Sequence, residues 1–344
     1  GDVAIGRHHD HDPARPSVHD GVVVLQRLEH LLRPLVRPAP RADVCHSAAN
    51  GLGVLVALAA KWDHGTPFIL AEHGIYLRET LLANGPDTMP AAARRLLLTF
   101  VRRLTQTGYE VADLITPGSD YNRRWERIEG ISDERIRCIH NGIDPDAFCD
   151  AGDEPDEPVI TWVGRINPLK DPKTLLRAFA RIHHSVPEAR LRIYGTAAQG
   201  DEDYARECRQ LLDDLDLRGS ASFEGRIPDA ADAYRQGQVV MLTSISEGFP
   251  FALIEAMSCG RPTVATDVGG VSEAVVDPSL LAPPRDDEQL AANCLRLLAD
   301  RSLRRSFGAA GRRKVVASFT LDACLQAHRS CYRELAGHQG DRAA

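Results

Sequence analysis

Two glutamates eight residues apart stand in an otherwise apolar stretch, "SISEGFPFALIEAMSCG", residues 244–260. Carboxylates are rarely buried without a partner, so Glu247 and Glu255 face either a cation of the core or a ligand. Pro250 and Gly260 are typical of the two ends of a helix. Glu247 then lies in the loop before the helix, whose N–H groups favour an anion, and Glu255 lies inside the helix. From the residues alone, a ligand-binding role and a structural role are equally good interpretations.

A second candidate site is the stretch "VGRINPLKD", in which Gly164 is expected to end a strand. Arg165 and Lys170 follow it, five residues apart. An arginine fork and a mobile lysine charge together suit a diphosphate. Two surface cations that pair with local acids are an equally good interpretation of this motif.

Two further strand exits carry weaker signals. In "AEHGIYLRE", His73 is a candidate polar contact to a ligand, although a lone histidine in such a place is more often structural. In "TDVGGVSEAV", the pair Gly269 and Gly270 would let the backbone approach a ligand, but packing alone would also account for it.

The elements that must position these residues alternate between strand and helix along the chain. This alternation predicts an α/β fold with two doubly wound lobes of parallel strands, whose ligands bind beyond the carboxyl ends of the strands. Seven acidic residues and no basic residue between 144 and 158 predict a solvated linker. The expected domains are therefore residues 1–150, residues 151–320, and a C-terminal helix and tail over 321–344. We also expect one helix over residues 21–40 and a strand in "RIRCIHNGID", residues 135–144.

Composition excludes several classes of protein. A net charge of −7 over 344 residues argues against nucleic-acid binding. The longest apolar run, residues 52–60, is too short to cross a bilayer. Eight scattered cysteines without a C-x-x-C pair predict reduced thiols in a cytoplasmic protein and no zinc site. The "HHDHD" run at residues 8–12 is expected to belong to a disordered tail.

One helix, expected over residues 90–108, carries a group of basic side chains. These are most simply a solvated face, and peripheral contact with an anionic membrane is the alternative. The group consists of Arg94, Arg95, Arg102 and Arg103.

Three stretches of the chain together resemble the signature of family-4 retaining glycosyltransferases, which have the GT-B fold. They are "GRINPLKD", "IHNGID" and "SEGFPFALIEAMSCGRPTVATDVGGVSEAV", and the resemblance covers residues 159–318. The glutamate pair matches the E-x7-E motif of that family. A narrower resemblance, over residues 42–80, is to the PelF-like exopolysaccharide glycosyltransferases.

The resemblance implies two Rossmann-like lobes that face a central cleft. It also implies a cytoplasmic, retaining, metal-independent hexosyltransferase that takes a nucleotide sugar, UDP-glucose or another UDP-sugar, and a saccharide acceptor, without a cofactor. Contact with a membrane or with a membrane polysaccharide synthase would follow from the PelF likeness. The implied roles are catalysis by His73 and Glu247, diphosphate binding by Arg165, Lys170, Gly248 and Phe249, ribose binding by Glu255, and proximity to the base for Gly225, Arg226 and Ile227.

Two departures from the family pattern affect these expectations. Residues 1–40 contain no first strand with a glycine-rich loop, so we expect an incomplete N-terminal lobe. Leu321 stands where the family often has an aromatic residue. A non-catalytic module that binds nucleotide sugars, and a sugar-nucleotide epimerase on the same fold, are therefore kept as alternatives.

Overall fold

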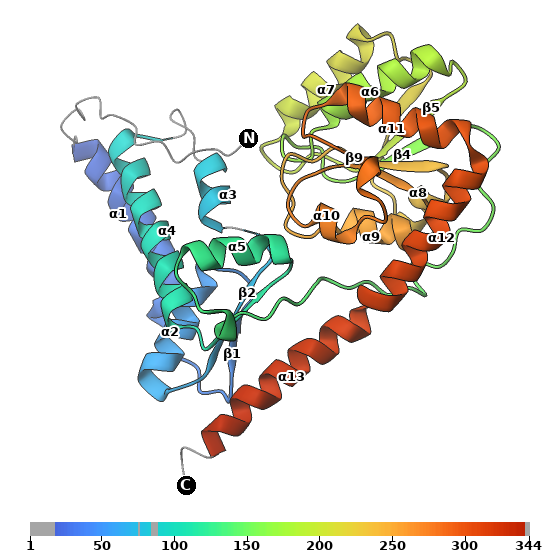
Figure 1. The fold of residues 1–344 in the computed structure, drawn as a ribbon. Coiled ribbons are helices and arrows are strands. Elements are labelled where there is room, and N and C mark those ends of the chain that lie inside the picture. Colours follow the sequence, from blue (N-terminus) through green and yellow to red (C-terminus); the bar gives the residue numbers. More distant parts are fainter. Residues whose placement is uncertain (1–17, 75, 84–88, 341–344) are drawn as a thin grey trace. The chain divides into compact units, whose positions relative to one another are not determined.

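The structure is a computed structural model, which describes residues 18–74, 76–83 and 89–340 (Figure 1). The chain forms two compact units. The first unit contains the described residues up to Thr116, residues 125–137 and those from Arg333 onward. The second unit contains residues 117–124 and 138–332. The "HHDHD" run lies outside the described residues.

The first unit is built on a three-stranded sheet with the order β1-β2-β3. The strands are β1 (Cys45–Ser47), β2 (Phe68–Glu72) and β3 (Leu114–Pro117), and β1 runs parallel to β2. Every residue of β2 and β3 is buried, as expected for strands that are covered on both faces. The helical elements are α1 (Val18–Leu32), η1 (Arg33–Val36), α2 (Gly53–His64), α3 (Tyr76–Ala83), α4 (Ala91–Val111), η2 (Asp133–Arg135) and the second part of α5 (Asp120–Ile128), whose residues 120–124 belong to the second unit.

The core of the first unit lies between α2, α4 and the sheet. Val54 and Leu58 of α2 pack with Leu104 of α4 and with Phe68 and Ile115 of the strands. The expected helix over residues 21–40 instead ends at Leu32 and continues as the short 3-10 turn η1, because Pro34 occupies the start of that turn. Of the four arginines of α4, Arg94 is half-buried and the other three are exposed. No helix of the described residues is long and apolar enough to cross a membrane.

The second unit is a six-stranded sheet with the order β6-β5-β4-β7-β8-β9, in which all neighbouring strands run parallel. The first strand of this unit, β4, lies in the middle of the sheet. The next two strands, β5 and β6, extend the sheet on one side of β4, and β7, β8 and β9 extend it on the other side. This order is that of doubly wound nucleotide-binding sheets, with the reversal between β4 and β7. The strands are β4 (Val159–Val163), β5 (Arg190–Tyr194), β6 (Ala221–Gly225), β7 (Val239–Leu242), β8 (Thr263–Thr266) and β9 (Leu281–Ala282).

Helices cover both faces of this sheet (Figure 1). One layer, with α6, α7 and α11, closes a core around the fully buried Trp162 and Phe179. The other layer, with α8, α9, α10 and α12, buries Leu253 and Met257 of α9. The helices of the unit are α6 (Pro172–Ser185), α7 (Glu202–Asp214), α8 (Ala230–Arg235), α9 (Phe251–Ser258), α10 (Val271–Ala274), α11 (Asp287–Ala299), α12 (Arg301–Ser318) and α13 (Leu321–Gly340), and η3 (Pro278–Leu280) precedes β9.

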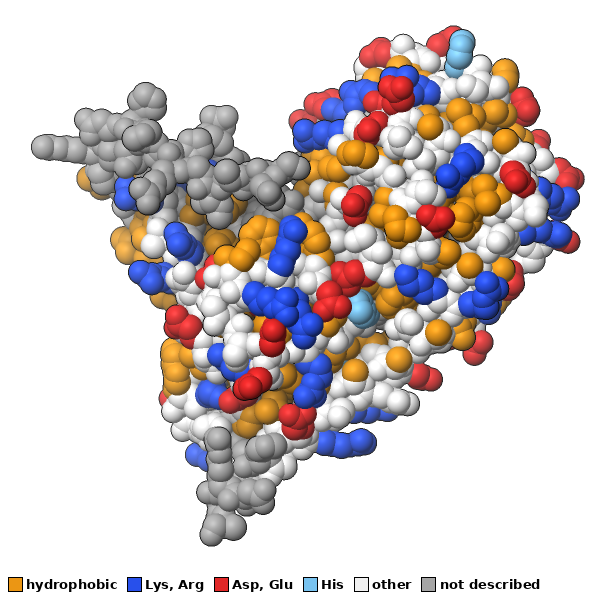
Figure 2. Space-filling view, in the orientation of Figure 1, with side chains coloured by type: hydrophobic (Ala, Val, Ile, Leu, Met, Phe, Trp, Pro, Cys, Tyr) orange, Lys and Arg blue, Asp and Glu red, His pale blue; other side chains and the backbone are white. Residues whose placement is uncertain are grey.

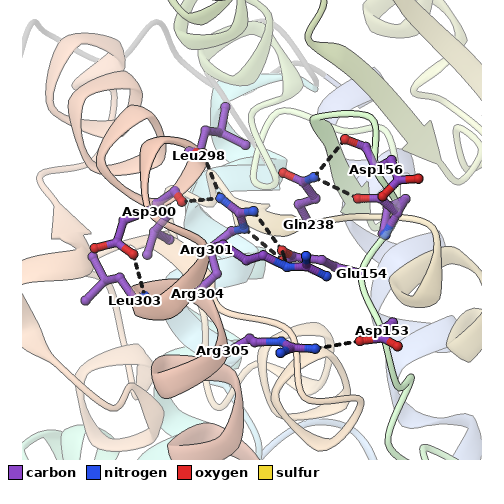
Figure 3. A network of polar contacts seen from close by, with 12 residues as sticks. Asp153, Glu154, Asp156, Gln238, Leu298, Asp300, Arg301, Leu303, Arg304 and Arg305 are labelled. Atoms are coloured by element: carbon purple, nitrogen blue, oxygen red, sulfur yellow. Dashed lines mark hydrogen bonds and ion pairs between the residues drawn. The ribbon is translucent and has the colours of Figure 1, made fainter.

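The acidic segment 144–158 is bound to the second unit, although its composition predicts a solvated linker. Arg304 donates to both carboxylate oxygens of Glu154, at 2.8 and 2.7 Å, and Arg305 lies 2.5 Å from Asp153 (Figure 3). Arg261 donates to the carbonyls of Gly152 and Asp153, each at 3.2 Å. These arginines hold the acidic run against the second unit, which contains residues 138–332, and the expected domain boundary at residue 150 stays a prediction.

The strand expected in residues 135–144, ahead of the Asn141–Gly142 turn, is present only as an isolated bridge to β3. Ile136 and Ile143 each make a single bridge, to Ile115 and Thr320 respectively, and the residues between them are irregular. The two bridges lead to partners in different units, so no continuous ladder can form along the segment. On the surface in view, basic and acidic side chains are interspersed (Figure 2).

Candidate functional site

The candidate site lies where β4 and β7 meet, at the reversal of strand order in the second unit. The loops that follow these two strands, residues 164–171 and 243–250, are joined directly. Ile245 N–H donates to the carbonyl of Leu169 at 2.7 Å, and the Thr243 hydroxyl donates to the carbonyls of Lys170 and Asp171 at 3.0 Å. The motif with Arg165 and Lys170 and the loop with Glu247 therefore belong to one site.

Lys170 and Glu247 form an ion pair across these loops. Lys170 Nζ lies 2.5 Å from Glu247 Oε1, and the Ser244 hydroxyl donates to the same oxygen at 2.5 Å. The side chains of Glu247 and Lys170 are 8% and 23% exposed, so the carboxylate is held almost out of water by a lysine that solvent still reaches. An incoming anion can therefore compete with Glu247 for Lys170.

The turn after Lys170 is fixed by Asp171, whose φ of 45° is in the left-handed region. Its carboxylate caps α6, accepting from Thr174 N–H at 3.2 Å and from the Thr174 hydroxyl at 2.6 Å. Arg165, at the other end of the same loop, is exposed and forms no hydrogen bond or ion pair with any other described residue. The loop thus offers one paired and one unengaged cation.

Glu255 lies in α9, after the N-terminal Pro250, and Glu247 lies in the loop before it, as the sequence predicts. The partner of Glu255 is not a core cation but Tyr234 of α8, whose hydroxyl donates to Glu255 Oε2 at 2.7 Å. Burial raises the pKa of Glu255, and the Tyr234 hydrogen bond offsets only part of that rise. The pKa of Tyr234, which is fully buried, is raised by its burial and by Glu255.

The Gly269–Gly270 turn packs against the backbone of the Glu247 loop. Gly269 has a φ of +59°, and a Cβ on it would lie 1.7 Å from the Glu247 carbonyl oxygen. Gly270 N–H donates to the Gly248 carbonyl at 2.9 Å. Packing does account for these glycines, and the backbone they pack against is that of the site itself.

Phe249 turns its side chain into the core, where it is 5% exposed and its ring centroid lies 5.0 Å from that of Phe319. Gly248 precedes it in the loop and is half-buried. Gly225 ends β6 with a φ of +75°, followed by an exposed Arg226 and a half-buried Ile227. The roles implied for these residues remain predictions.

His73 is the first residue after β2 in the first unit, and it is exposed. The preceding Glu72 is buried, and both its oxygens accept from the Tyr109 hydroxyl, at 2.6 and 2.7 Å. Burial and the Glu72 charge raise the pKa of Tyr109. His73 is thus placed at a strand exit, and its catalytic role stays a prediction.

Glu273 of α10 is a polar centre that the sequence did not single out. Its two oxygens accept from the N–H groups of Asp120 and Tyr121, at 2.9 and 2.7 Å, at the start of α5. His140 Nε2 lies 2.9 Å from Glu273 Oε2. Burial pushes the pKa of Glu273 upward, but the hydrogen bonds from His140 and from the two N–H groups outweigh it, so the pKa lies below its usual value. The only sequence signal was its place after the glycine pair.

The fold is that of the GT-B glycosyltransferases, which confirms the predicted class. The Anabaena protein HepE, solved in complex with UDP, superposes with a TM-score of 0.72 at 19% identity, over 90% of this chain and 81% of its own. Sucrose-phosphate synthase from Thermosynechococcus elongatus superposes with a TM-score of 0.73 at 24% identity, over 91% of this chain and 77% of its own.

Residues 147–314, just under half of the chain, match the family described as "Glycosyl transferases group 1". Residues 4–134 match a "Domain of unknown function (DUF3492)". A D-inositol 3-phosphate glycosyltransferase of Kribbella flavida is 29% identical over 292 residues, which are 78% of this chain and 66% of that protein. One of Rhodococcus jostii is 32% identical over 221 residues, 61% of this chain and 48% of that protein. The chain thus spans between about half and two thirds of these relatives' length.

Proposed function

We propose that this protein is a retaining glycosyltransferase that moves a sugar from a nucleotide-sugar donor, a UDP-sugar, to a saccharide hydroxyl. The observation that carries the proposal is the cluster of Lys170, Glu247 and Ser244 at the reversal of strand order in a group 1 domain. UDP is favoured as the nucleotide because HepE was solved with UDP and with UDP-glucose. We place the reaction in the cytoplasm, in line with the scattered cysteines.

In this proposal the cations hold the donor diphosphate. Lys170 breaks its ion pair with Glu247 and binds a phosphate oxygen, and Arg165 binds the diphosphate from the same loop. The free N–H groups at the start of α9 complete the anion site. Glu255, held by Tyr234, accepts from the ribose hydroxyls. Glu247 then accepts from hydroxyls of the donor sugar, and the catalytic role of His73 is kept as part of the proposal.

The reaction breaks the bond between the anomeric carbon and the diphosphate oxygen and forms a bond from that carbon to the acceptor oxygen. Attack from the face that the diphosphate leaves retains the anomeric configuration. The acceptor's proton passes to a phosphate oxygen of the departing nucleoside diphosphate. Arg165 and Lys170 stabilise the negative charge that develops on this leaving group, so the step needs neither a protein nucleophile nor a metal ion.

Two classes of acceptor are candidates for this reaction. The PelF likeness of residues 42–80 favours a growing exopolysaccharide and contact with a membrane synthase. The names of the curated relatives favour a phosphorylated inositol as a second acceptor class. An acceptor panel that contains glucose oligosaccharides and inositol phosphates, supplied with UDP-glucose, separates the two by product analysis.

A thermal-shift screen across UDP-, GDP- and ADP-sugars tests the donor, and we expect stabilisation by UDP-sugars. Turnover with donor alone that yields an epimerised nucleotide sugar would support the epimerase instead. Binding without turnover across the acceptor panel would support the non-catalytic module. The site assignment is wrong if donor turnover survives both Lys170→Ala and Glu247→Ala within a few fold.

A further inference from the structure

Three metal-ligating side chains converge beside residues 248–249, in the loop that precedes α9. Asp120 is the first residue of α5, and Cys138 and His140 lie in the irregular segment that begins the main part of the second unit. One ligand atom from each lies within 4.8 Å of the others. Cys138 Sγ is 3.8 Å from His140 Nε2, which in turn is 2.9 Å from Glu273 Oε2. Three potential ligands, Asp120, Cys138 and His140, are therefore close enough to share one ion, and the Glu273 carboxylate lies against His140.

The local backbone explains why these side chains meet. Residues at i and i+2 of an extended segment share a side, and Ile139, between Cys138 and His140, donates its N–H to the Pro117 carbonyl at 2.9 Å. The same contact brings the start of α5 alongside. A spacing search for C-x-x-C pairs misses this C-x-H pair, whose third member comes 18 residues before Cys138 in the chain.

The arrangement does not fit a cysteine–histidine–carboxylate nucleophile. In such a triad the thiol and the carboxylate bind different ring nitrogens, whereas here Cys138 and Glu273 both approach His140 Nε2. The imidazole packs against two phenylalanine rings that also contact each other, with centroids 4.9 Å from Phe249 and 5.4 Å from Phe319. Donors that converge on one nitrogen of an oriented ring match ligands around a common ion.

We propose that Asp120, Cys138, His140 and Glu273 bind a zinc ion. A thiolate, an imidazole and carboxylates are the donor set that Zn²⁺ accepts. Tetrahedral zinc with Zn–S of about 2.3 Å and Zn–N of about 2.0 Å places the sulfur and nitrogen about 3.5 Å apart, near the 3.8 Å between Cys138 Sγ and His140 Nε2. On binding, Glu273 exchanges its His140 hydrogen bond for the ion, and its bonds to the N–H groups of Asp120 and Tyr121 keep it oriented.

The ion would stiffen the backbone that supports residues 248–249 of the loop 243–250. Asn141, next to His140, donates to the Phe249 carbonyl at 3.5 Å, and Gly270, three residues before Glu273, is bonded to Gly248. The zinc would join these two supports of residues 248–249 to the start of α5. Asp120 is exposed, and Cys138 and His140 are half-buried, so the ion can reach the site from solvent.

The test measures metal content and affinity directly, and so does not depend on the proposed transferase activity. The full chain carries a second set of histidines, in the "HHDHD" run, so all measurements use a background in which His8, His9 and His11 are alanine. After dialysis against a chelator, zinc is titrated calorimetrically and counted by mass spectrometry. Cobalt(II) then reports thiolate ligation through its charge-transfer absorption.

We expect one zinc per chain in this background and a thiolate-to-cobalt band. Cys138→Ser should abolish the band and weaken zinc by more than about tenfold, since loss of a ligand costs at least as much as loss of a residue that only orients one. Cys149→Ser, at an exposed cysteine outside the cluster, should change neither. Asp120→Asn, at an exposed site, provides a second variant with little risk to folding and should also weaken binding. No zinc in the background protein, or unchanged zinc affinity and cobalt band in Cys138→Ser, would overturn the proposal.

Discussion

Lys170 Nζ and Glu247 Oε1 lie 2.5 Å apart, across two loops that leave neighbouring strands of the second unit. The pair neutralises a nearly buried carboxylate while no anion is present. A diphosphate that binds Lys170 therefore also frees Glu247 to accept hydroxyl hydrogen bonds. In the proposed reaction, donor binding and preparation of the sugar-binding carboxylate become one event.

Lys170→Ala is expected to weaken UDP binding by about 10- to 100-fold, because a hydrogen bond to a charged group contributes about 1.5–3 kcal/mol. Isothermal titration with UDP measures the effect. Lys173→Ala is the matched control, since Lys173 lies three residues on and pairs with Glu207 at 2.6 Å on the surface. Equal losses of affinity in both variants would mean that Lys170 has no specific role.

Glu247→Gln should separate nucleotide binding from sugar binding. UDP has no donor sugar and competes with the carboxylate for Lys170, so its affinity is expected to be unchanged or higher. Turnover of a UDP-sugar should fall at least about tenfold, because the amide is a weaker hydrogen-bond acceptor than the carboxylate. Titration with UDP and steady-state kinetics measure the two effects. If UDP affinity and turnover both fell, the assignment of Glu247 to the sugar would be contradicted.

Gly269→Ala is expected to destabilise the second unit by about 2–5 kcal/mol, the sum of the left-handed backbone cost and the overlap with the Glu247 carbonyl. Gly219→Ala is the control, because Gly219 also has a positive φ, +87°, but has open space around its Cβ position. It should lose only about 1–2 kcal/mol. Urea denaturation measures both. Similar losses in the two variants would show that the close approach to Glu247 has no energetic consequence.

The sequence predicts the elements around the site better than the contacts inside it. Pro250 and Gly260 correctly bracket α9, and the α/β alternation predicts the sheet that brings Lys170 and Glu247 to one edge. The partners themselves come from far along the chain: 77 residues separate Lys170 from Glu247, and 133 separate His140 from Glu273. Nothing local encodes such pairs. The prediction of a solvated linker over residues 144–158 failed for the same reason, since Arg304, which neutralises Glu154, follows 150 residues later.

Tyr234→Phe should change the pH dependence of UDP binding. Burial already raises the pKa of Glu255, and the Tyr234 hydrogen bond counteracts part of that rise, so its loss should raise the pKa further. A protonated Glu255 is a poorer acceptor for ribose hydroxyls, so affinity should fall as the pH is lowered, with a midpoint at higher pH in the variant. Titrations with UDP between pH 5 and 8 measure the midpoints. A Tyr234→Phe profile that superposes on that of the wild type would rule out the positioning role of Tyr234.

Glu154→Gln is expected to destabilise the second unit at neutral pH, because it leaves the buried Arg304 without its carboxylate partner. Breaking a buried pair in this way costs about 3–5 kcal/mol.

Burial raises the pKa of Glu154, but the Arg304 hydrogen bond and the charges of Arg304, Arg301 and Arg261 lower it by more, so the net pKa is below its usual value. The stabilisation is therefore complete above the unfolded-state pKa of about 4.3 and is lost as the pH falls through the lower folded-state pKa. The difference in free energy of unfolding between wild type and variant should thus shrink between pH 7 and pH 3, as measured by urea denaturation at each pH. Asp153→Asn is the control, since that side chain is 81% exposed and its pair with Arg305 lies at the surface, and it should cost less than about 1 kcal/mol. A difference for Glu154→Gln that is the same at both pH values would show that the ion pair with Arg304 does not stabilise the fold.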